Sequence, residues 1–330
     1  MKLIKALCFA VTSAVVGSAS MPLLATAADA TKDYPSRPIR YIMPNAPGSS
    51  NDTLGRIVAA KLGEALGQQI VVDNRAGAGG ILGMEIGKNA NPDGYTLVAA
   101  STAAMSIAPH LHKKLPYDPV KDFEFISLYA VTPNILVVTP RLPIKTVKEL
   151  IDYAKSKNGQ INMASAGAGA QSHLSGAAFM YAAKMDSLHV PYKGGGASVA
   201  AVVAGESQWT LTPAPAVWAL VKSGRLRAIG QSLAKRTPLL GDLPSISETV
   251  KGFDYSGWNG MLAPKGTPNP ILAKLRETLV KVVNSPEVKA QFEAQAAQVT
   301  TDTPEEFRKL VANEIKSVAP VVKAAGLTAN

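Results

Sequence analysis

Short runs rich in β-forming residues alternate with amphipathic segments along the chain from residue 39 onward. The first unit predicts a strand over residues 39–43, a loop over 44–51 and a helix over 52–66 with its apolar residues on one face. Further strands are predicted over residues 69–73, 95–100, 134–138, 160–165, 188–192, 209–212 and 226–231, and further helices over 81–89, 147–155, 172–183, 197–204, 216–224, 269–283, 286–297 and from a capping box at 303–306. This alternation indicates parallel βαβ units and predicts an α/β fold.

The chain of 330 residues is long enough to divide into two hydrophobic cores. No low-complexity linker and no short-period repeat occurs in the sequence. Two domains are therefore expected to be joined by structured crossings of the chain rather than by a flexible tether. A junction of this kind favours a hinge.

The N-terminus has the pattern of a secretory signal peptide. Lys2 and Lys5 precede an uncharged apolar stretch from residue 6 to about residue 24, and small residues follow. Residues 1–30 are predicted to be removed by cleavage after Ala27 or Ala30, which would place the mature protein in the periplasm. A membrane anchor is the alternative, although serine, threonine and proline residues interrupt the apolar run.

Cysteine content and charge narrow the classes of function. Cys8 lies inside the signal peptide, so the mature chain is expected to lack disulfides, zinc–thiolate sites and cysteine nucleophiles. The net charge is +10, and the mature chain keeps +8 or +9 because it loses two basic residues and at most one acid. This excess suits an anionic ligand. The basic residues are scattered and do not alternate with aromatic residues, which argues against nucleic-acid binding.

Two loops have the character of an anion-binding cradle. Residues 44–52 and residues 164–173 each run from a predicted strand into a predicted helix and are rich in glycine, alanine and serine. Small residues let backbone N–H groups approach a ligand, hydroxyls add donors, and a helix N-terminus supplies partial positive charge. Either loop alone could be an ordinary turn with a helix cap. Two such loops at the carboxyl ends of strands indicate a shared ligand site.

Two residues in these loops have competing interpretations. His173 could cap its helix, orient the loop or assist the ligand, in that order. Asp52 could be a helix N-cap without any role in binding. Each remains a candidate site residue on this basis.

Motifs for catalysis, metals and nucleotides are weak. Residues 77–83 resemble a dinucleotide fingerprint, but the third glycine comes one residue late, and no GxxxxGK[ST] or GxSxG motif occurs. The SxxK match that starts at Ser232 lacks the motifs that accompany it in enzymes, and His110 and His112 are interpreted as surface-loop residues. No catalytic residue, metal site or cofactor is predicted.

Several motifs spread over the chain resemble the Bug family of periplasmic solute receptors, the binding proteins of tripartite tricarboxylate transporters. The resemblance runs from about Tyr34 to the C-terminus. Its markers are Pro47 and Gly48 with Asp52 and Arg56, residues 74–80 (NRAGAGG), 92–97 (PDGYTL), 114–119 (KLPYDP), 165–173, 190–194 (VPYKG) and 262–268 (LAPKGTP).

The resemblance implies a type II periplasmic-binding fold with two lobes, each a mainly parallel sheet flanked by helices, joined by two crossing strands. Domain 1 would comprise residues 31–130 and 253–330, and domain 2 would be inserted as residues 131–252. A carboxylate would be held by backbone amides and hydroxyls of both loops. The residues expected to bind it are Ser49, Ser50, Asn51, Asp52, Ser101, Thr102, Ser165, Gly167, Ala168, Gly169, Ala170, Gln171, His173 and Thr212.

Departures from the family pattern bear on the ligand. Many relatives have glycine at the position of Ser49, serine at that of Ala170 and an acid at that of Thr212. Without that acid an ammonium group has no natural partner, so a di- or tricarboxylate or an aromatic carboxylate is expected rather than an amino acid.

The resemblance implies a monomeric, non-enzymatic receptor whose closed form docks on the membrane subunits of a transporter. Two alternatives remain open from the sequence. One is an exported hydrolase that acts on a carboxylate ester through Ser165 or His173, and the other is a receptor that signals to a membrane kinase.

Overall fold

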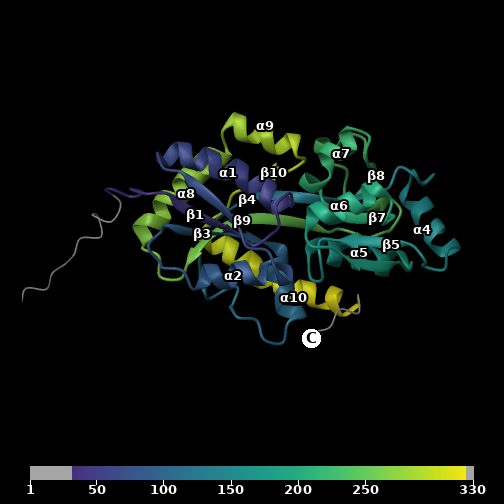
Figure 1. The fold of residues 1–330 in the computed structure, drawn as a ribbon, viewed down its shortest axis with the longest axis horizontal. Helices are drawn as coiled ribbons and strands as arrows, with labels where there is room; N and C mark the ends of the chain where they lie inside the picture. The colour runs from purple at the N-terminus through teal and green to yellow at the C-terminus, as the bar shows by residue number, and fades with distance from the viewer. Residues whose placement is uncertain (1–31, 325–330) are drawn as a thin grey trace, which may run out of the picture.

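The computed structural model describes residues 32–324. The predicted signal peptide, including Cys8, lies outside the described residues. Within them, the strands form one curled sheet in the order β2-β1-β3-β9-β4-β7-β5-β6, with β8 and β10 also paired to β4. Figure 1 shows helices on both faces of this sheet along its length. The fold is α/β, as the alternation of strands and helices predicts.

One lobe is built on three parallel strands near the start of the chain. β1 (Ile39–Met43) lies between β2 (Ile70–Asn74) and β3 (Thr96–Ser101). One face is covered by α1 (Ser50–Leu66), α8 (Asn269–Val283) and α9 (Pro286–Ala294), and the other by α2 (Ile81–Lys88) and α10 (Pro304–Ala324). Shorter pieces are a 3₁₀ turn (Ala78–Gly80), a π-helical turn (Ala103–Ile107), α3 (Ala108–Leu111) and β10 (Gln298–Val299). Fully buried Tyr41 and Phe307 lie in the separate hydrophobic cores of the two faces.

The other lobe repeats this plan with the middle of the chain. β5 (Asn162–Ser165) lies parallel to β6 (Leu188–Pro191) and β7 (Trp209–Pro213), and β8 (Arg227–Gln231) joins through β4. α4 (Val147–Ser156) and α5 (Gln171–Ala183) cover one face, and α6 (Gly195–Ala204) and α7 (Trp218–Lys222) cover the other. Three 3₁₀ turns complete it: Ala214–Ala216, Pro238–Leu240 and Ile246–Glu248.

Two long strands cross between the lobes. β4 (Phe123–Val138) pairs with β9 (Ser256–Pro264) as far as Pro133, and then with β7 and β8 from Asn134 onward. Pro133 lies where the partner changes, a position that tolerates the missing backbone N–H. The resemblance implied two crossing strands, and the structure contains them. Because β4 pairs with strands of both lobes, the division of the chain at residues 130/131 and 252/253 stays a prediction.

The predicted elements occur with shifted ends, and three differ more than this. The strand predicted over residues 134–138 is only the last part of β4. The helix predicted over residues 216–224 is shortened to α7, because a 3₁₀ turn ends at Ala216 and Val217 has a non-helical backbone conformation. The helix predicted over 286–297 ends at Ala294.

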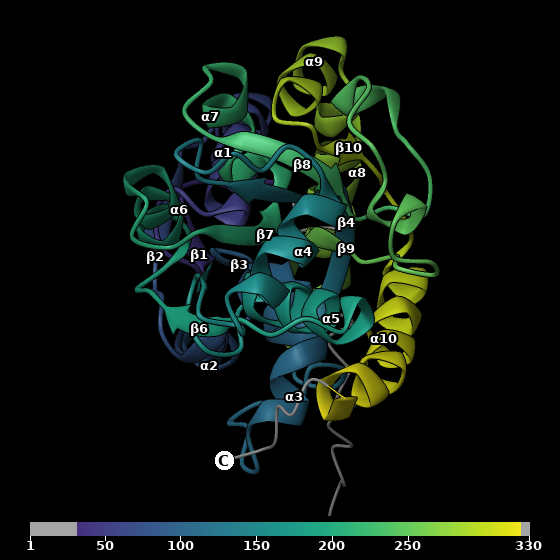
Figure 2. The same cartoon turned by 90° about the vertical axis from the view of Figure 1, so that its right-hand side faces the viewer.

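α10 connects the two lobes. Its Val318 and Val322 pack with Ile107 of the first lobe and Leu174 of α5 in the second, and Figure 2 shows α10 beside α5. The predicted capping box is present, since Thr303 N–H donates to Glu306 Oε2 (2.9 Å) and Glu306 N–H to Thr303 Oγ1 (3.2 Å). No helix in the described part of the chain has both the length and the apolar character needed to cross a bilayer.

Candidate ligand-binding site

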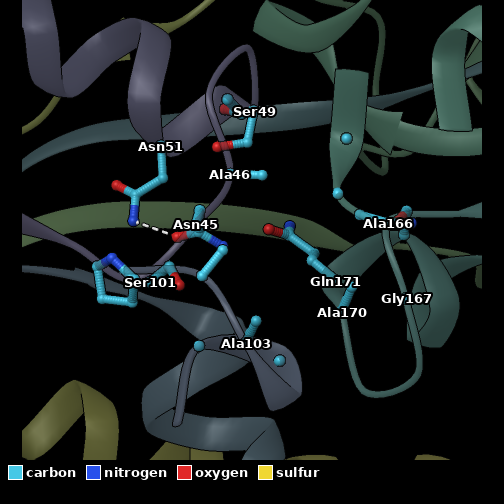
Figure 3. Close-up of a pocket in the computed structure, with 18 of the residues that line it drawn as sticks. Asn45, Ala46, Ser49, Asn51, Ser101, Ala103, Ala166, Gly167, Ala170 and Gln171 are labelled. Carbon is cyan, nitrogen blue, oxygen red and sulfur yellow. Dashed lines mark hydrogen bonds between the residues drawn. The ribbon is translucent and has the colours of Figure 1, made fainter. Parts of the chain in front are cut away.

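A cavity of about 500 Å³ lies between the two lobes. Its walls come from segments at the carboxyl ends of all six parallel strands: β1, β2 and β3 in one lobe, and β5, β6 and β7 in the other. Ligands of open α/β sheets bind at this edge, where loops diverge from the strands. Figure 3 shows the two walls facing each other, with Asn45, Asn51 and Ser101 on one side and Ala166, Ala170 and Gln171 on the other.

Four helices begin at the cavity. Their N-cap residues Ser49 (α1), Gly80 (α2), Ala170 (α5) and Gly194 (α6) all line it. Ser49 caps its own helix through Oγ, which accepts from Asp52 N–H (3.3 Å). The other three helices have no side-chain cap, so their first-turn amides remain available to a ligand. The helix dipoles place partial positive charge at the same point.

Three polar atoms on the first-lobe wall have no hydrogen-bond partner among the described residues: Ser50 Oγ, Ser101 Oγ and Asn259 Oδ1. All three residues are buried. An unpaired buried polar atom costs about 1–3 kcal/mol, so such atoms gathered at one cavity are best explained by a polar occupant.

The charge of the cavity favours an anion. Among the described residues that line it, Lys193 is the one charged residue, and it is exposed at the end of β6. None of the lining residues in the described part of the chain is an aspartate or a glutamate. A bound carboxylate therefore meets uncapped helix N-termini and a lysine without a competing negative charge.

The first loop is held in shape by Asp52, which does not line the cavity. Its carboxylate accepts from Gly48 N–H (2.9 Å), Arg56 Nε (3.0 Å) and Asn74 Nδ2 (2.8 Å), and the residue is only 4% exposed. It fastens the loop to the end of β2. The N-cap of α1 is Ser49, so the interpretation of Asp52 as the N-cap was wrong.

The second loop uses part of its own backbone for shape. Ala166 N–H donates to Ser172 Oγ (2.9 Å), Gly167 N–H to Ser165 Oγ (3.2 Å) and Gly169 N–H to His173 Nδ1 (3.2 Å). Those amides are occupied within the loop. The amides of Ala168 in the loop and of Gln171 and Ser172 at the start of α5 remain available to a ligand. The Gln171 side chain points toward Asn45 in Figure 3.

A buried pair of imidazoles supports the second loop from behind. The rings of His173 and His189 stack with centroids 3.7 Å apart and planes 5° apart, and His189 Nε2 lies 2.6 Å from Ser165 Oγ. Burial, helped by His189, lowers the pKa of His173 to about 4, and burial also lowers the pKa of His189. Both rings are neutral at pH 7. Of the three roles considered for His173, the geometry supports orientation of the loop.

The structure brings most of the expected binding residues to the cavity surface. The residues that line it are Ser49, Ser50, Asn51, Ser101, Gly167, Ala168, Ala170, Gln171 and Thr212. The residues that are not among the lining residues are Asp52, Thr102, Ser165, Gly169 and His173. Thr102 Oγ1, for example, accepts from Trp258 N–H (3.2 Å) and ties β3 to β9. Contact of any of these residues with a ligand stays a prediction.

Sequence reasoning did not assign several lining residues to the site. They are residues 76–80, Ala103, residues 192–195, Pro213, Ala216 and Asn259. Residues 76–80 and 192–195 were singled out as motifs, and their glycines directly after strands were the usable signal. Asn259 lies inside a strand without any local signal.

The residues weighed for catalysis or metal binding lie elsewhere. Ser232 is buried. Its Oγ accepts from Asn134 N–H (2.9 Å) and donates to the Tyr255 carbonyl oxygen. His110 is half-buried, with Nε2 2.6 Å from the Ile315 carbonyl oxygen. In residues 32–324, no group of three or more His, Cys, Asp or Glu side chains is placed to hold a metal ion.

Comparison with known proteins agrees with this geometry. Residues 54–327 match the model of the tripartite tricarboxylate transporter family receptor, TctC. The chain is similar to a Rhodopseudomonas palustris protein solved with adipate (30% identity, TM-score 0.88, covering 90% of this chain and 100% of that one). It is also similar to the periplasmic binding protein BugD (32%, 0.86, 90% and 100%) and to MatC of Rhodopseudomonas palustris with bound malate (30%, 0.82, 88% and 100%). The chain therefore belongs to the TctC, or Bug, family of solute receptors.

Proposed function

We propose that this protein is a periplasmic receptor that binds a small carboxylate between its two lobes and delivers it to the membrane subunits of a tripartite tricarboxylate-type transporter. The observation that carries the proposal is the cavity where four helix N-termini meet two unpartnered serine hydroxyls and no acidic side chain. We further propose that the receptor acts as a monomer and that residues 131–252 form the inserted domain.

The cavity supports a compact di- or tricarboxylate or an aromatic carboxylate. Its volume of about 500 Å³ lies within the usual range for small-molecule sites. Relatives have been solved with adipate and with malate, both dicarboxylates. Since no acid is found among the described residues that line the cavity, the ammonium group of an amino acid would lack a counter-charge.

The free energy of binding requires hydrogen bonds from both walls of the cavity. A hydrogen bond to a charged group is worth about 1.5–3 kcal/mol, and micromolar affinity requires about 8 kcal/mol beyond the cost of association. The hydrogen bonds from a single loop would barely supply this free energy. Closure of the lobes around the ligand therefore accounts for both the affinity and the recognition of the loaded form by a transporter.

A thermal-shift screen tests the proposal. The mature protein would be denatured, freed of ligand, refolded and screened against aliphatic and aromatic carboxylates, followed by calorimetric titration of those that stabilise it. A ligand at 100 times its dissociation constant adds about 2.7 kcal/mol of stability. If no carboxylate raises the melting temperature, or if glutamate or aspartate binds more tightly than every unaminated acid, the proposed ligand class is wrong.

The two free hydroxyls provide a sharper test. Ser50→Ala and Ser101→Ala should each weaken carboxylate binding by 10-fold or more, because each removes a hydrogen-bond donor to a charged group. Neither should lower the stability of the ligand-free protein, since neither hydroxyl has a protein partner. Ser156→Ala, at an exposed helix end in the second lobe, is the matched control and should change neither quantity. Loss of stability with unchanged affinity would contradict the assigned role.

The Ser165–His189 pair is the one feature that suggests the alternative of an ester hydrolase. Ser165 has no exposed surface and does not line the cavity, so its hydroxyl cannot reach a bound ester. The family consists of solute receptors and not enzymes. Deletion of the gene followed by measurement of carboxylate uptake separates transport from signalling to a membrane kinase, because only transport requires the receptor for uptake.

A further inference from the structure

Asn259 places a hydrogen-bond acceptor in the cavity wall that a carboxylate cannot satisfy. Asn259 is 4% exposed, and its Oδ1 has no hydrogen-bond partner among the described residues. Asn259 is the cross-strand partner of Ser101 in the β3–β9 ladder, so the unpartnered Ser101 hydroxyl lies beside it. The two serine hydroxyls can donate or accept, whereas an amide oxygen only accepts.

The orientation of the Asn259 amide follows from its neighbour. Asn259 Nδ2 donates to Asn51 Oδ1 at 2.9 Å. If the Asn259 amide were turned over, its oxygen would face the oxygen of Asn51 and the bond would be lost. The cavity therefore meets Oδ1 and not the NH₂ group.

The Asn51 amide is fixed in turn by two further contacts. Its Nδ2 donates to Asn45 Oδ1 (2.8 Å), as Figure 3 shows, and its Oδ1 also accepts from Tyr129 Oη (3.1 Å). Tyr41 Oη donates to Tyr129 Oη (3.4 Å) from the core. Because each group in this chain has its donor and acceptor roles set by the next, the acceptor at the cavity is built into the first lobe.

Because Asn259 Oδ1 accepts hydrogen bonds, it favours a ligand that has a hydrogen-bond donor at this position. A carboxylate oxygen beside Oδ1 would be repelled, whereas an O–H or N–H group would pair with it. An ammonium group would find no acid in the cavity wall, which leaves a hydroxyl as the matching group. The helix N-termini and the serine hydroxyls donate hydrogen bonds to the carboxylate itself.

We infer that Asn259 is a specificity-determining residue that accepts a hydrogen bond from a ligand hydroxyl, so that the receptor prefers hydroxycarboxylates over the unhydroxylated acids of equal length. This inference rests on the proposed function as a carboxylate receptor. It assigns the ligand a hydroxyl near the carboxylate that the helix N-termini hold.

Matched pairs of acids test the inference on the refolded mature protein. The pairs are malate with succinate, 2-hydroxyadipate with adipate and hydroxybenzoates with benzoate, each measured by calorimetric titration. In at least one pair, the hydroxylated acid should bind 10-fold or more tightly, which corresponds to about 1.4 kcal/mol. This wild-type ratio needs no variant and so does not depend on whether a variant folds.

Two variants then localise the preference. Asn259→Leu has similar size and no acceptor, and Asn259→Ser is smaller and offers a hydroxyl that can donate to a carboxylate. Asn259→Leu should reduce the preference, taken as the ratio of the two dissociation constants within one pair, to less than threefold, and Asn259→Ser should reduce it less, because a hydroxyl can still accept a hydrogen bond. Ser101→Ala, the cross-strand neighbour, should instead weaken both members of a pair alike.

The outcomes separate this inference from the proposed function. If no carboxylate binds, the proposed function fails. If carboxylates bind but the hydroxylated and plain acids bind equally, Oδ1 is met by water and the inference alone is overturned. A preference that survives in both Asn259 variants overturns it as well, as does tighter binding of aspartate or glutamate than of malate.

Discussion

His173 holds the second cradle loop in shape without lining the cavity. Nδ1 accepts from Gly169 N–H, which requires that nitrogen to be unprotonated, and the ring stacks on His189. A proton on His173 would break the bond to the loop and place a positive charge against the second imidazole. The side chain thus couples the shape of the second cradle loop to pH.

The lowered pKa of His173 predicts a loss of stability in acid. The unfolded imidazole takes up a proton near its ordinary pKa of 6.5, whereas the folded one does so only at about 4. Stability should therefore fall as pH decreases from about 6.5 to about 4, by up to about 3 kcal/mol, and this contribution should level off below that. Urea denaturation at pH 7.5 and pH 4.5 measures the difference.

The matched variant is His173→Asn, whose side-chain oxygen can still accept from Gly169 N–H but does not titrate. Its stability should depend less steeply on pH than that of the wild type. An equal slope in the two proteins would show that other groups govern the acid response.

α10 is tied to the centre of the molecule by Glu314. Its Oε2 accepts from Ser106 Oγ (2.5 Å) in the π-helical turn after β3 and from Trp258 Nε1 (2.6 Å) on the crossing strand β9. Burial raises the pKa of Glu314, while these two hydrogen bonds oppose the shift. One carboxylate thus joins the C-terminal helix to the segment that follows β3 and to the strand that connects the lobes.

Removal of this link should be costly. Glu314→Ala leaves two donors without an acceptor and should lower the free energy of unfolding by about 2–4 kcal/mol, measured by urea denaturation. Glu314→Gln keeps one acceptor oxygen and should cost less than half as much. Ser317→Ala, at an exposed position on the same helix, is the control and should stay near wild type. A Glu314→Ala protein as stable as wild type would contradict the role of this link.

The two lobes approach each other at residues without bulky side chains in the cavity wall. A Cβ added to Gly194 of the second lobe would lie 2.5 Å from Ala46 Cβ of the first. A Cβ added to Gly79 of the first lobe would lie 3.6 Å from the backbone of Gly169 in the second. The loops of the two lobes therefore approach each other closely, and at Gly194 the absence of a side chain permits the contact.

Gly194→Ala should oppose this close approach. The added methyl group meets Ala46 at a distance that no relaxed contact has, so ligand affinity should fall by 10-fold or more in calorimetric titration. Gly194 also has a positive φ of +106°, which strains an alanine there regardless of space.

Gly224→Ala separates the two effects. Gly224 has a φ of +71° and no atom within 4 Å of an added Cβ, so its variant carries backbone strain of about 1 kcal/mol without a clash. It should lose stability but bind ligand as tightly as wild type. If Gly194→Ala also binds normally, the contact with Ala46 is not needed for the bound state.

The pattern of apolar residues determined the local units of this protein. The strand at β1, the helix α8 and the capping box at Thr303 follow from periodicity and capping over a few residues, and the structure confirms them. The two cradle loops could also be found, because small residues between a strand and a helix are visible in the sequence. These features depend on neighbours close in the chain.

Only the tertiary structure decided how these units combine. β4 and β9 are buried along nearly their whole length, so they lack the alternation that marks a half-buried strand, and pattern reasoning found only the end of β4. Within the loops, Asp52 and His173 turn away from the cavity because their hydrogen-bond partners lie behind it. Asn259 reaches the site through pairing of β9 with β3, far away in sequence. Local propensity acts over a few residues, whereas a cavity between two lobes is formed by contacts between distant segments.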